Sequence, residues 1–222
     1  DPPENIVMAA VEQAKACGAD LVIGFGGGSS MDVAKLVALL AHPDCAQSLQ
    51  DIYGVGNAKG QRLPLIQVPT TAGTGSEVGR ASVITNSETH VKKIIFHPKV
   101  LPAVVICDPE LTVGMPKFIT AGTGLDAFAH CVEAFSSPHY HPMSQGIALE
   151  GMRLVIDNLP RAYADGTDIE ARANMMSAAA MGATAFQKGL GAIHAMSHPI
   201  GAVFNTHHGT TNAVCMPAVL EL

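Results

Sequence analysis

Residues 21–32 read Leu-Val-Ile-Gly-Phe-Gly-Gly-Gly-Ser-Ser-Met-Asp, a short apolar run that passes through consecutive glycines into a helical stretch. The apolar run is typical of a buried strand, and residues 31–41 carry a helical pattern. A strand, a glycine turn and a helix in this order place backbone N–H groups against a phosphate. Gly24 to Ser29 is a near match to GxGxxG, with Ser29 in the third place. The same glycines also suit a tight turn without a ligand, so this loop alone leaves both interpretations open.

A second loop of similar composition follows a second apolar run, at residues 63–68. Residues 69–77 read Pro-Thr-Thr-Ala-Gly-Thr-Gly-Ser-Glu, which is rich in hydroxyl groups and glycine. Ligands of parallel sheets bind at the carboxyl ends of the strands, where both loops are expected to converge. The pair of loops therefore favours a nucleotide over plain turns.

Strand and helix signals alternate over the first half of the chain, and only helix signals follow. The alternation predicts an α/β nucleotide-binding domain with a mostly parallel sheet over residues 1–108, followed by an all-α domain over 109–222. The patterns place strands at 21–25, 63–68, 82–85, 91–96 and 104–107, with 82–85 and 91–96 forming a hairpin. They place helices at 4–17, 31–41, 125–136, 143–157, 169–188, 193–204 and 213–222.

Composition and charge exclude several classes of protein. Hydrophobic residues make up 48% of the chain and charged residues 14%, which is typical of a well-buried globular protein. The net charge of −6 disfavours nucleic acid and anionic membranes as partners. The five cysteines lie far apart, which predicts free thiols in a reducing, cytoplasmic compartment. Because the chain opens on a helix-start signature at residues 1–4 and stops within a helical pattern, we expect an internal piece of a longer protein, with apolar surface exposed on its helical half.

Asp126 and His130 lie four residues apart on a predicted helix, so both point to one face. Glu133 continues this polar face one turn further. An Asp/His pair at this spacing is more often a hydrogen-bonded pair than a metal site, so it is weak evidence when taken alone.

Further histidines follow in the last fifth of the chain. His194 and His198 are again four apart, although Pro199 predicts a kink there, and His208 is expected in a turn between helices. His139 and His141 are expected on a surface loop. One carboxylate and three imidazoles form a reasonable ligand set for a divalent transition metal.

Taken together, these segments resemble the iron-containing (group III) alcohol dehydrogenases. The resemblance covers the whole chain in one order. The matching segments are GGGSSMD at 26–32 (family GGGSxxD), PTTAGTGSE at 69–77, GLDAFAH at 124–130 (GxDAxxH), HAMSHPIGA at 194–202 (HxxxHPLGA) and NTHHG at 205–209 (NxPHG). Ile200 stands for the usual Leu and His207 for the usual Pro.

The resemblance implies a dehydroquinate synthase-like fold with the active site in a cleft between the two domains. It implies Fe²⁺, or Zn²⁺ or another divalent metal, bound by Asp126, His130, His194 and His208. His198 is then a catalytic residue beside the metal, suited to passing the alcohol proton to solvent. It implies NAD or NADP contacted by Gly27, Gly28, Ser29, Asp32, Thr70, Thr71, Thr74 and Lys92.

The implied reaction is hydride transfer between NAD(P) and a small primary alcohol, diol or aldehyde, in a homo-oligomer. Family members carry a further strand and helix before residue 1, where NAD and NADP are distinguished, and more helices after residue 222. Two alternative functions stay open: a non-redox, NAD- and metal-dependent lyase or synthase of the dehydroquinate synthase type, and a non-catalytic nucleotide-binding protein. The lyase or synthase needs Lys and Arg around its metal, and few lie near these motifs.

Overall fold

The structure is a computed structural model that describes residues 2–86, 89 and 91–221. It falls into two compact units, Asp1–Pro69 with Ser76–Cys107, and Thr70–Gly75 with Asp108–Leu222. The loop Thr70–Gly75 therefore packs with the helical unit, whereas the sequence placed all of residues 1–108 in one domain. The described part of the chain has no helix that is both long and apolar enough to cross a membrane.

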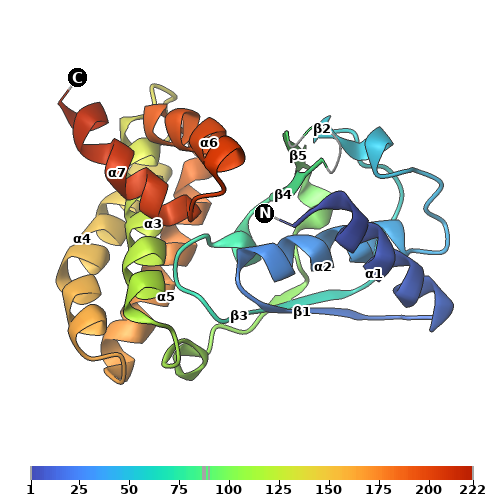
Figure 1. Ribbon diagram of the computed structural model, residues 1–222, viewed down its shortest axis with the longest axis horizontal. Helices are drawn as coiled ribbons and strands as arrows, with labels where there is room; N and C mark the ends of the chain where they lie inside the picture. The colour runs from blue at the N-terminus through green and yellow to red at the C-terminus, as the bar shows by residue number, and fades with distance from the viewer. Residues whose placement is uncertain (1, 87–88, 90, 222) are drawn as a thin grey trace. The chain divides into compact units, whose positions relative to one another are not determined.

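The first unit is built around a parallel sheet (Figure 1). Its strands follow the order β1 (Val22–Gly26), β3 (Leu65–Pro69) and β6 (Val104–Val105), and both pairs are parallel. Helix α2 (Gly28–Leu40) packs on β1 and β3, and α1 (Glu4–Ala16) packs on α2. The core between these elements includes Val7, Val11, Leu36, Leu39 and Leu65. The predicted strand, glycine turn and helix at the start of this unit are confirmed.

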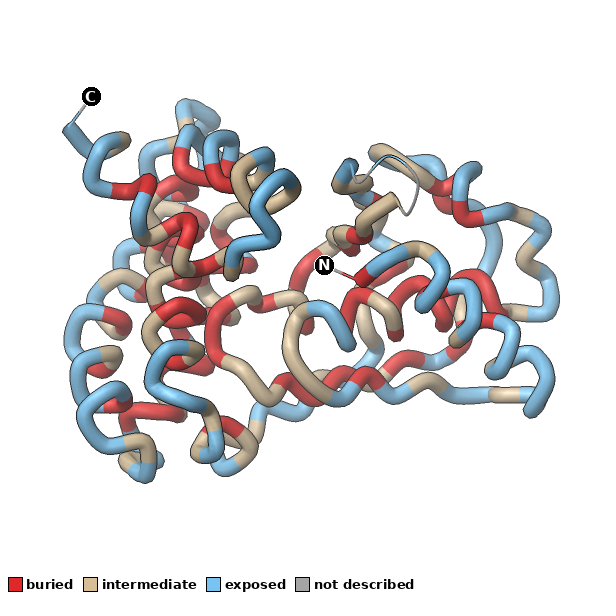
Figure 2. The backbone as a smooth tube through the Cα atoms, viewed as in Figure 1, coloured by how far each residue is buried: buried red, intermediate tan, exposed pale blue. Residues whose placement is uncertain are grey.

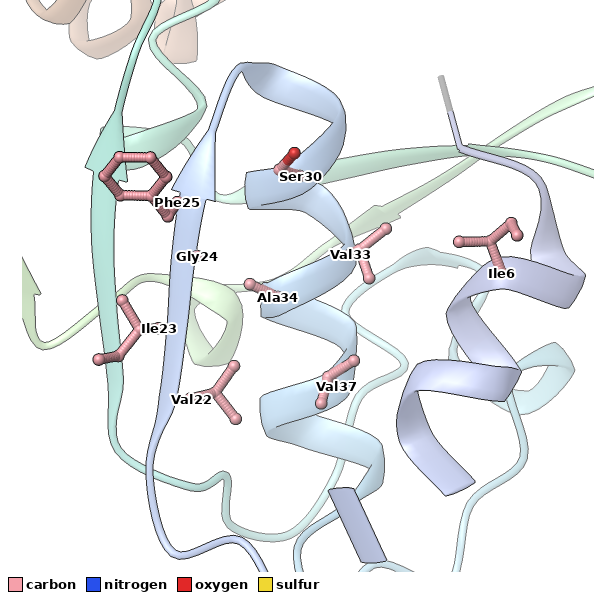
Figure 3. A pocket seen from close by; sticks show the side chains of 9 residues that line it. All are labelled: Ile6, Val22, Ile23, Gly24, Phe25, Ser30, Val33, Ala34 and Val37. Carbon is pink, nitrogen blue, oxygen red and sulfur yellow. The ribbon is translucent and has the colours of Figure 1, made fainter. Parts of the chain in front are cut away.

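The other face of β1 is open in the described part of the chain. Figure 3 shows Val22 on the side that faces α2 and Ile23 and Phe25 on the opposite side. Ile23 is 57% exposed and Phe25 is 59% exposed. The prediction of a buried strand is therefore wrong for these two residues, because helix α2 covers only the first side. The groove between α1, α2 and β1 is lined mainly by aliphatic side chains such as Ile6, Val33 and Val37.

A second small sheet contains the predicted hairpin. Strands β4 (Ala81–Thr85) and β5 (Lys92–Phe96) pair antiparallel, and β2 (Gly54–Val55) adds to β5 in parallel. Residues 87, 88 and 90 of the hairpin turn lie outside the described residues. Hydrogen bonds from α2 connect this sheet to the helix. Asp32 Oδ2 accepts the Val83 N–H at 2.8 Å, and Lys35 Nζ donates to the Ala81 carbonyl at 2.6 Å.

The second unit consists of packed helices arranged around α3. Figure 2 shows buried residues along α3 and the helices packed on it. Helix α5 is buried at Met175, Ala178 and Ala179. The helices are α3 (Lys117–Ser136), α4 (Pro142–Ala164), α5 (Ile169–Ala185), α6 (Ala192–Phe204) and α7 (His208–Leu220).

Several helix boundaries differ from the prediction. Helix α1 begins at Glu4 as predicted but ends at Ala16, one residue early, and Asp1 lies outside the described residues. The turn predicted at His208 is wrong, since His208 is the first residue of α7. Asn205, with φ of 50°, ends α6, and His207 caps α7 by accepting the Thr210 N–H at 3.3 Å. Only residues 205–207 are therefore left between the two helices.

Candidate metal centre

Three helices of the second unit bring one carboxylate and three imidazoles together. Asp126 and His130 come from α3, His194 from α6, and His208 from the start of α7. Asp126 Oδ1 lies 3.8 Å from His130 Nε2, 3.6 Å from His194 Nε2 and 3.4 Å from His208 Nε2. Asp126, His130 and His194 are buried, whereas the His208 side chain is 32% exposed. The cluster is therefore closed on one side and accessible at His208.

A close helix crossing places His208 beside Asp126. A Cβ atom on Gly209 would lie 2.0 Å from the Gly122 carbonyl oxygen, and one on Gly122 would lie 2.8 Å from the His207 ring. Because neither position has a side chain, the backbones of α3 and α7 meet one turn before Asp126. The first residue of α7 then reaches the carboxylate.

Asn212 adds an amide to the cluster. Its Nδ2 donates to Asp126 Oδ1 at 2.7 Å and lies 3.1 Å from His194 Nε2 and 3.2 Å from His208 Nε2. Within the described residues, Asn212 Oδ1 and His130 Nδ1 are buried without a hydrogen-bond partner. Sequence reasoning missed Asn212, because it placed His208 in a turn. Once α7 begins at His208, Asn212 lies one turn further on the same face.

Glu133 is the second residue that sequence reasoning left without a role. Its Oε1 accepts the backbone N–H of Ile193 at 2.6 Å and of His194 at 3.2 Å, and its Oε2 bonds to Nδ1 of His194. The signal was its spacing, since residues 126, 130 and 133 share one face of α3.

Burial and charge shift the pKa values of this cluster strongly. Burial would raise the pKa of Asp126, but His130, His194 and His208 hold it well below its usual range. Burial lowers the pKa of His130 to about 4 despite the nearby Asp126. Burial would also lower the pKa of His194, but hydrogen bonds to Asp126 and Glu133 outweigh it and raise this pKa to about 9. The cluster therefore holds ionised Asp126 and neutral His130 near neutral pH, both in the forms that bind metals, whereas the His194 ring is protonated and would release its Nε2 proton when a metal binds.

The geometry of these donors fits a first-row divalent metal. Two ligand atoms that are each about 2.1 Å from a tetrahedral metal lie roughly 3.4 Å apart, close to the separations around Asp126 Oδ1. Carboxylate and imidazole donors suit iron and zinc alike. Asp126, His130 and His194 offer donor atoms that all lie within 4.8 Å of one another.

His198 lies next to two of these imidazoles. Its ring centroid is 5.7 Å from that of His194 and 5.3 Å from that of His208. Helix α6 continues through Pro199, so His194 and His198 remain on one face. His139 is exposed, and His141 caps α4 by accepting the Ser144 N–H at 3.0 Å.

Three of the expected cofactor residues of the first unit, Gly27, Gly28 and Ser29, lie at the start of α2. Gly27 is the N-cap and Gly28 the first residue of this helix, and no side chain caps its N-terminus. Gly26 has φ of 139°, which favours glycine. Asp32 lies in the same helix, but its carboxylate bonds to Val83 and Ser76. Burial lowers the pKa of Lys92, which lies on β5.

Thr70, Thr71 and Thr74 belong to the second unit. Thr71 Oγ1 is buried without a hydrogen-bond partner in the described part of the chain. The glycines of this loop have packing roles, because a Cβ on Gly73 would lie 2.5 Å from Thr123 and one on Gly75 would lie 2.2 Å from Ala183 Cβ.

Comparisons with known proteins show the family to which the chain is related. Residues 1–109 match the family described as iron-containing alcohol dehydrogenase, and residues 120–222 match the family described as Fe-containing alcohol dehydrogenase, C-terminal. The chain is 47% identical to 4-hydroxybutyrate dehydrogenase of Cupriavidus necator, over all of this chain and 59% of that protein.

Two solved structures show the same similarity. A crystal structure of 1,3-propanediol oxidoreductase superposes with a TM-score of 0.94 at 36% identity, covering 98% of this chain and 57% of that one. Sulfoacetaldehyde reductase from Bifidobacterium kashiwanohense, in complex with NAD⁺, superposes with a TM-score of 0.90 at 36% identity, covering 96% and 57%. The chain thus spans less than two thirds of the relatives it matches, and its fold is dehydroquinate synthase-like.

Proposed function

Because the chain belongs to the iron-containing alcohol dehydrogenase family, we propose that its protein transfers hydride between NAD(P) and a small primary alcohol, diol or aldehyde. The observation that carries this proposal is the convergence of His130, His194 and His208 on Asp126 Oδ1. Family membership supports iron as the metal, and NAD is supported by the NAD⁺ complex of sulfoacetaldehyde reductase.

In this proposal Asp126, His130, His194 and His208 would hold the divalent metal. A metal bound there would supply Lewis-acid stabilisation of negative charge on the alcohol oxygen, and NAD(P) would supply the hydride acceptor. The closed side of the cluster excludes water from Asp126, and the exposed side at His208 leaves room for a small substrate.

His198 is the proposed proton acceptor. It is half-buried, lies next to His194 and His208, and has an imidazole whose usual pKa is near neutrality. A proton that leaves the alcohol can therefore pass through His198 to solvent.

The names of the relatives support a short primary alcohol as the substrate. The matched proteins are named for 4-hydroxybutyrate and 1,3-propanediol, each a short chain with a terminal hydroxyl group. We further propose a cytoplasmic homo-oligomer with no nucleic-acid or membrane partner.

The test of this function is formation of reduced nicotinamide by the full-length protein, loaded with Fe²⁺ under anaerobic conditions and given a panel of short alcohols and diols. We expect turnover that requires both metal and cofactor. Turnover that survives complete removal of the metal would contradict the proposal.

Replacing Gly28 with Val is expected to abolish NAD(P)H binding while leaving most of the fold intact. The start of α2 is proposed to hold the cofactor's pyrophosphate through backbone N–H groups, and a branched side chain would keep the phosphate away. Titration with NAD(P)H, followed by its fluorescence, measures this effect. Unchanged affinity would mean that the glycine turn is only structural.

A further inference from the structure

Glu133 is a buried carboxylate that reaches the metal cluster through His194. Its side chain is 4% exposed, and both of its oxygens accept hydrogen bonds. One oxygen accepts the backbone N–H groups at the start of α6, where Gly191 is the N-cap and no other side chain caps the helix. The other oxygen bonds to Nδ1 of His194. Glu133 therefore fixes both the beginning of α6 and the ring of its metal-ligand candidate.

We propose that Glu133 is a positioning residue that keeps a proton on Nδ1 of His194 and so presents the lone pair of Nε2 to the metal. An imidazole that binds a metal through one nitrogen keeps its single proton on the other, and the Glu133 carboxylate can only accept a hydrogen bond from that proton. Nε2 is the atom that faces Asp126, at 3.6 Å. The inference rests on the proposed metal-dependent function.

Two neighbouring features support this role. His130 Nδ1 has no hydrogen-bond partner in the described residues. Of these two buried imidazoles, only His194 is therefore held by a hydrogen bond at Nδ1. A Cβ on Gly191 would lie 3.0 Å from Glu133 Oε1 and 3.3 Å from its Cδ. The absence of a side chain at Gly191 thus lets the Glu133 carboxylate approach the start of α6.

Glutamine cannot replace Glu133 in this arrangement. The carboxylate faces N–H donors on both sides, the backbone of α6 and Nδ1 of the ring, so both oxygens must accept. In Glu133→Gln one end becomes an NH₂ group. If the amide oxygen accepts from the N-terminus of α6, the NH₂ group faces Nδ1 of His194 and donates to it. The ring then carries its proton on Nε2, so Nε2 has no lone pair for the metal.

The test is the metal affinity of Glu133→Gln in the full chain, measured by chelator competition with Zn²⁺ and Fe²⁺. We expect affinity to fall about 10–100-fold, while the melting temperature of the metal-free protein changes little. Asp168→Asn is the matched control, because Asp168 caps α5 by accepting the Ala171 N–H at 3.0 Å. It should keep full affinity.

Two further measurements separate positioning from a purely structural role. In ¹⁵N NMR spectra of the Zn²⁺-loaded protein, we expect the His194 proton on Nδ1 in the wild type and its loss or a large shift in Glu133→Gln. Gly191→Ala, which pushes against Glu133 without altering it, should also weaken metal binding. Wild-type affinity in both variants would overturn the inference. A wild type that binds no metal would instead overturn the proposed function, whereas the Nδ1 proton could still be observed in the metal-free protein.

Discussion

Replacing His208 with Ala is expected to remove most of the bound metal and, with it, the turnover. Of the three imidazoles, His208 lies closest to Asp126 Oδ1, at 3.4 Å, and the three remaining metal ligands would leave the metal open to water. Since loss of a residue that only supports a ligand costs 10–100-fold in affinity, loss of the ligand itself should cost more than about 100-fold. Metal content by elemental analysis and chelator competition measure the effect.

His198→Ala is the matched control for this prediction. His198 lies within 5.7 Å of His194 by ring centroids and is proposed to move a proton, not to bind the metal. Its replacement should leave metal content near normal and lower the rate, most at low pH, where release of the alcohol proton is hardest. Loss of metal in His198→Ala with full metal in His208→Ala would reverse the assignment of these two residues.

Replacing Gly209 with Ala should also weaken metal binding, although Gly209 carries no functional group. The added Cβ would lie 2.0 Å from the Gly122 oxygen, roughly 1.5 Å short of an ordinary carbon contact. Helix α7 must then move away from α3 and take His208 with it. We expect overpacking to lower the free energy of unfolding by about 1–3 kcal/mol and metal affinity to fall as well.

Gly146→Ala provides the comparison for Gly209→Ala. Gly146 lies within α4, and no atom lies within 4 Å of the position its Cβ would take. Alanine should therefore stabilise the helix by about 0.5–1 kcal/mol and leave metal binding unchanged. Thermal unfolding with and without metal checks both variants. A Gly209→Ala protein with full affinity would show that the crossing of α3 and α7 does not position His208.

The sequence was sufficient for features that depend on local pattern. The apolar run at residues 21–25 and the glycines after it predicted β1 and the helix that follows, although α2 begins at Gly28 and not at the predicted Met31. Spacing alone placed Asp126 and His130 on one face. The exposure of Ile23 and Phe25 could not be predicted, because a single sequence does not show which face of a strand is covered.

The boundaries around the site depended on tertiary contacts. Helix α3 begins at Lys117, eight residues before the predicted start at Leu125. Gly122 and Gly124 interrupt its helical pattern, yet close packing requires both, since a Cβ on Gly124 would lie 2.4 Å from Leu159. Gly209 likewise suggested a turn, so the start of α7 at His208 was not predicted. Asn212 was missed as a consequence, and Glu133 because its partner His194 lies on another helix.

The most direct test of the proposed ligand set is X-ray absorption at the metal edge of the protein loaded with one equivalent of Fe²⁺ or Zn²⁺. We expect a first shell of nitrogen and oxygen at about 2.0–2.2 Å, with multiple-scattering features of three imidazoles that fall to two in His208→Ala. If His208→Ala keeps three imidazoles and His198→Ala loses one, or if the first shell contains no imidazole, the proposed ligand set is wrong.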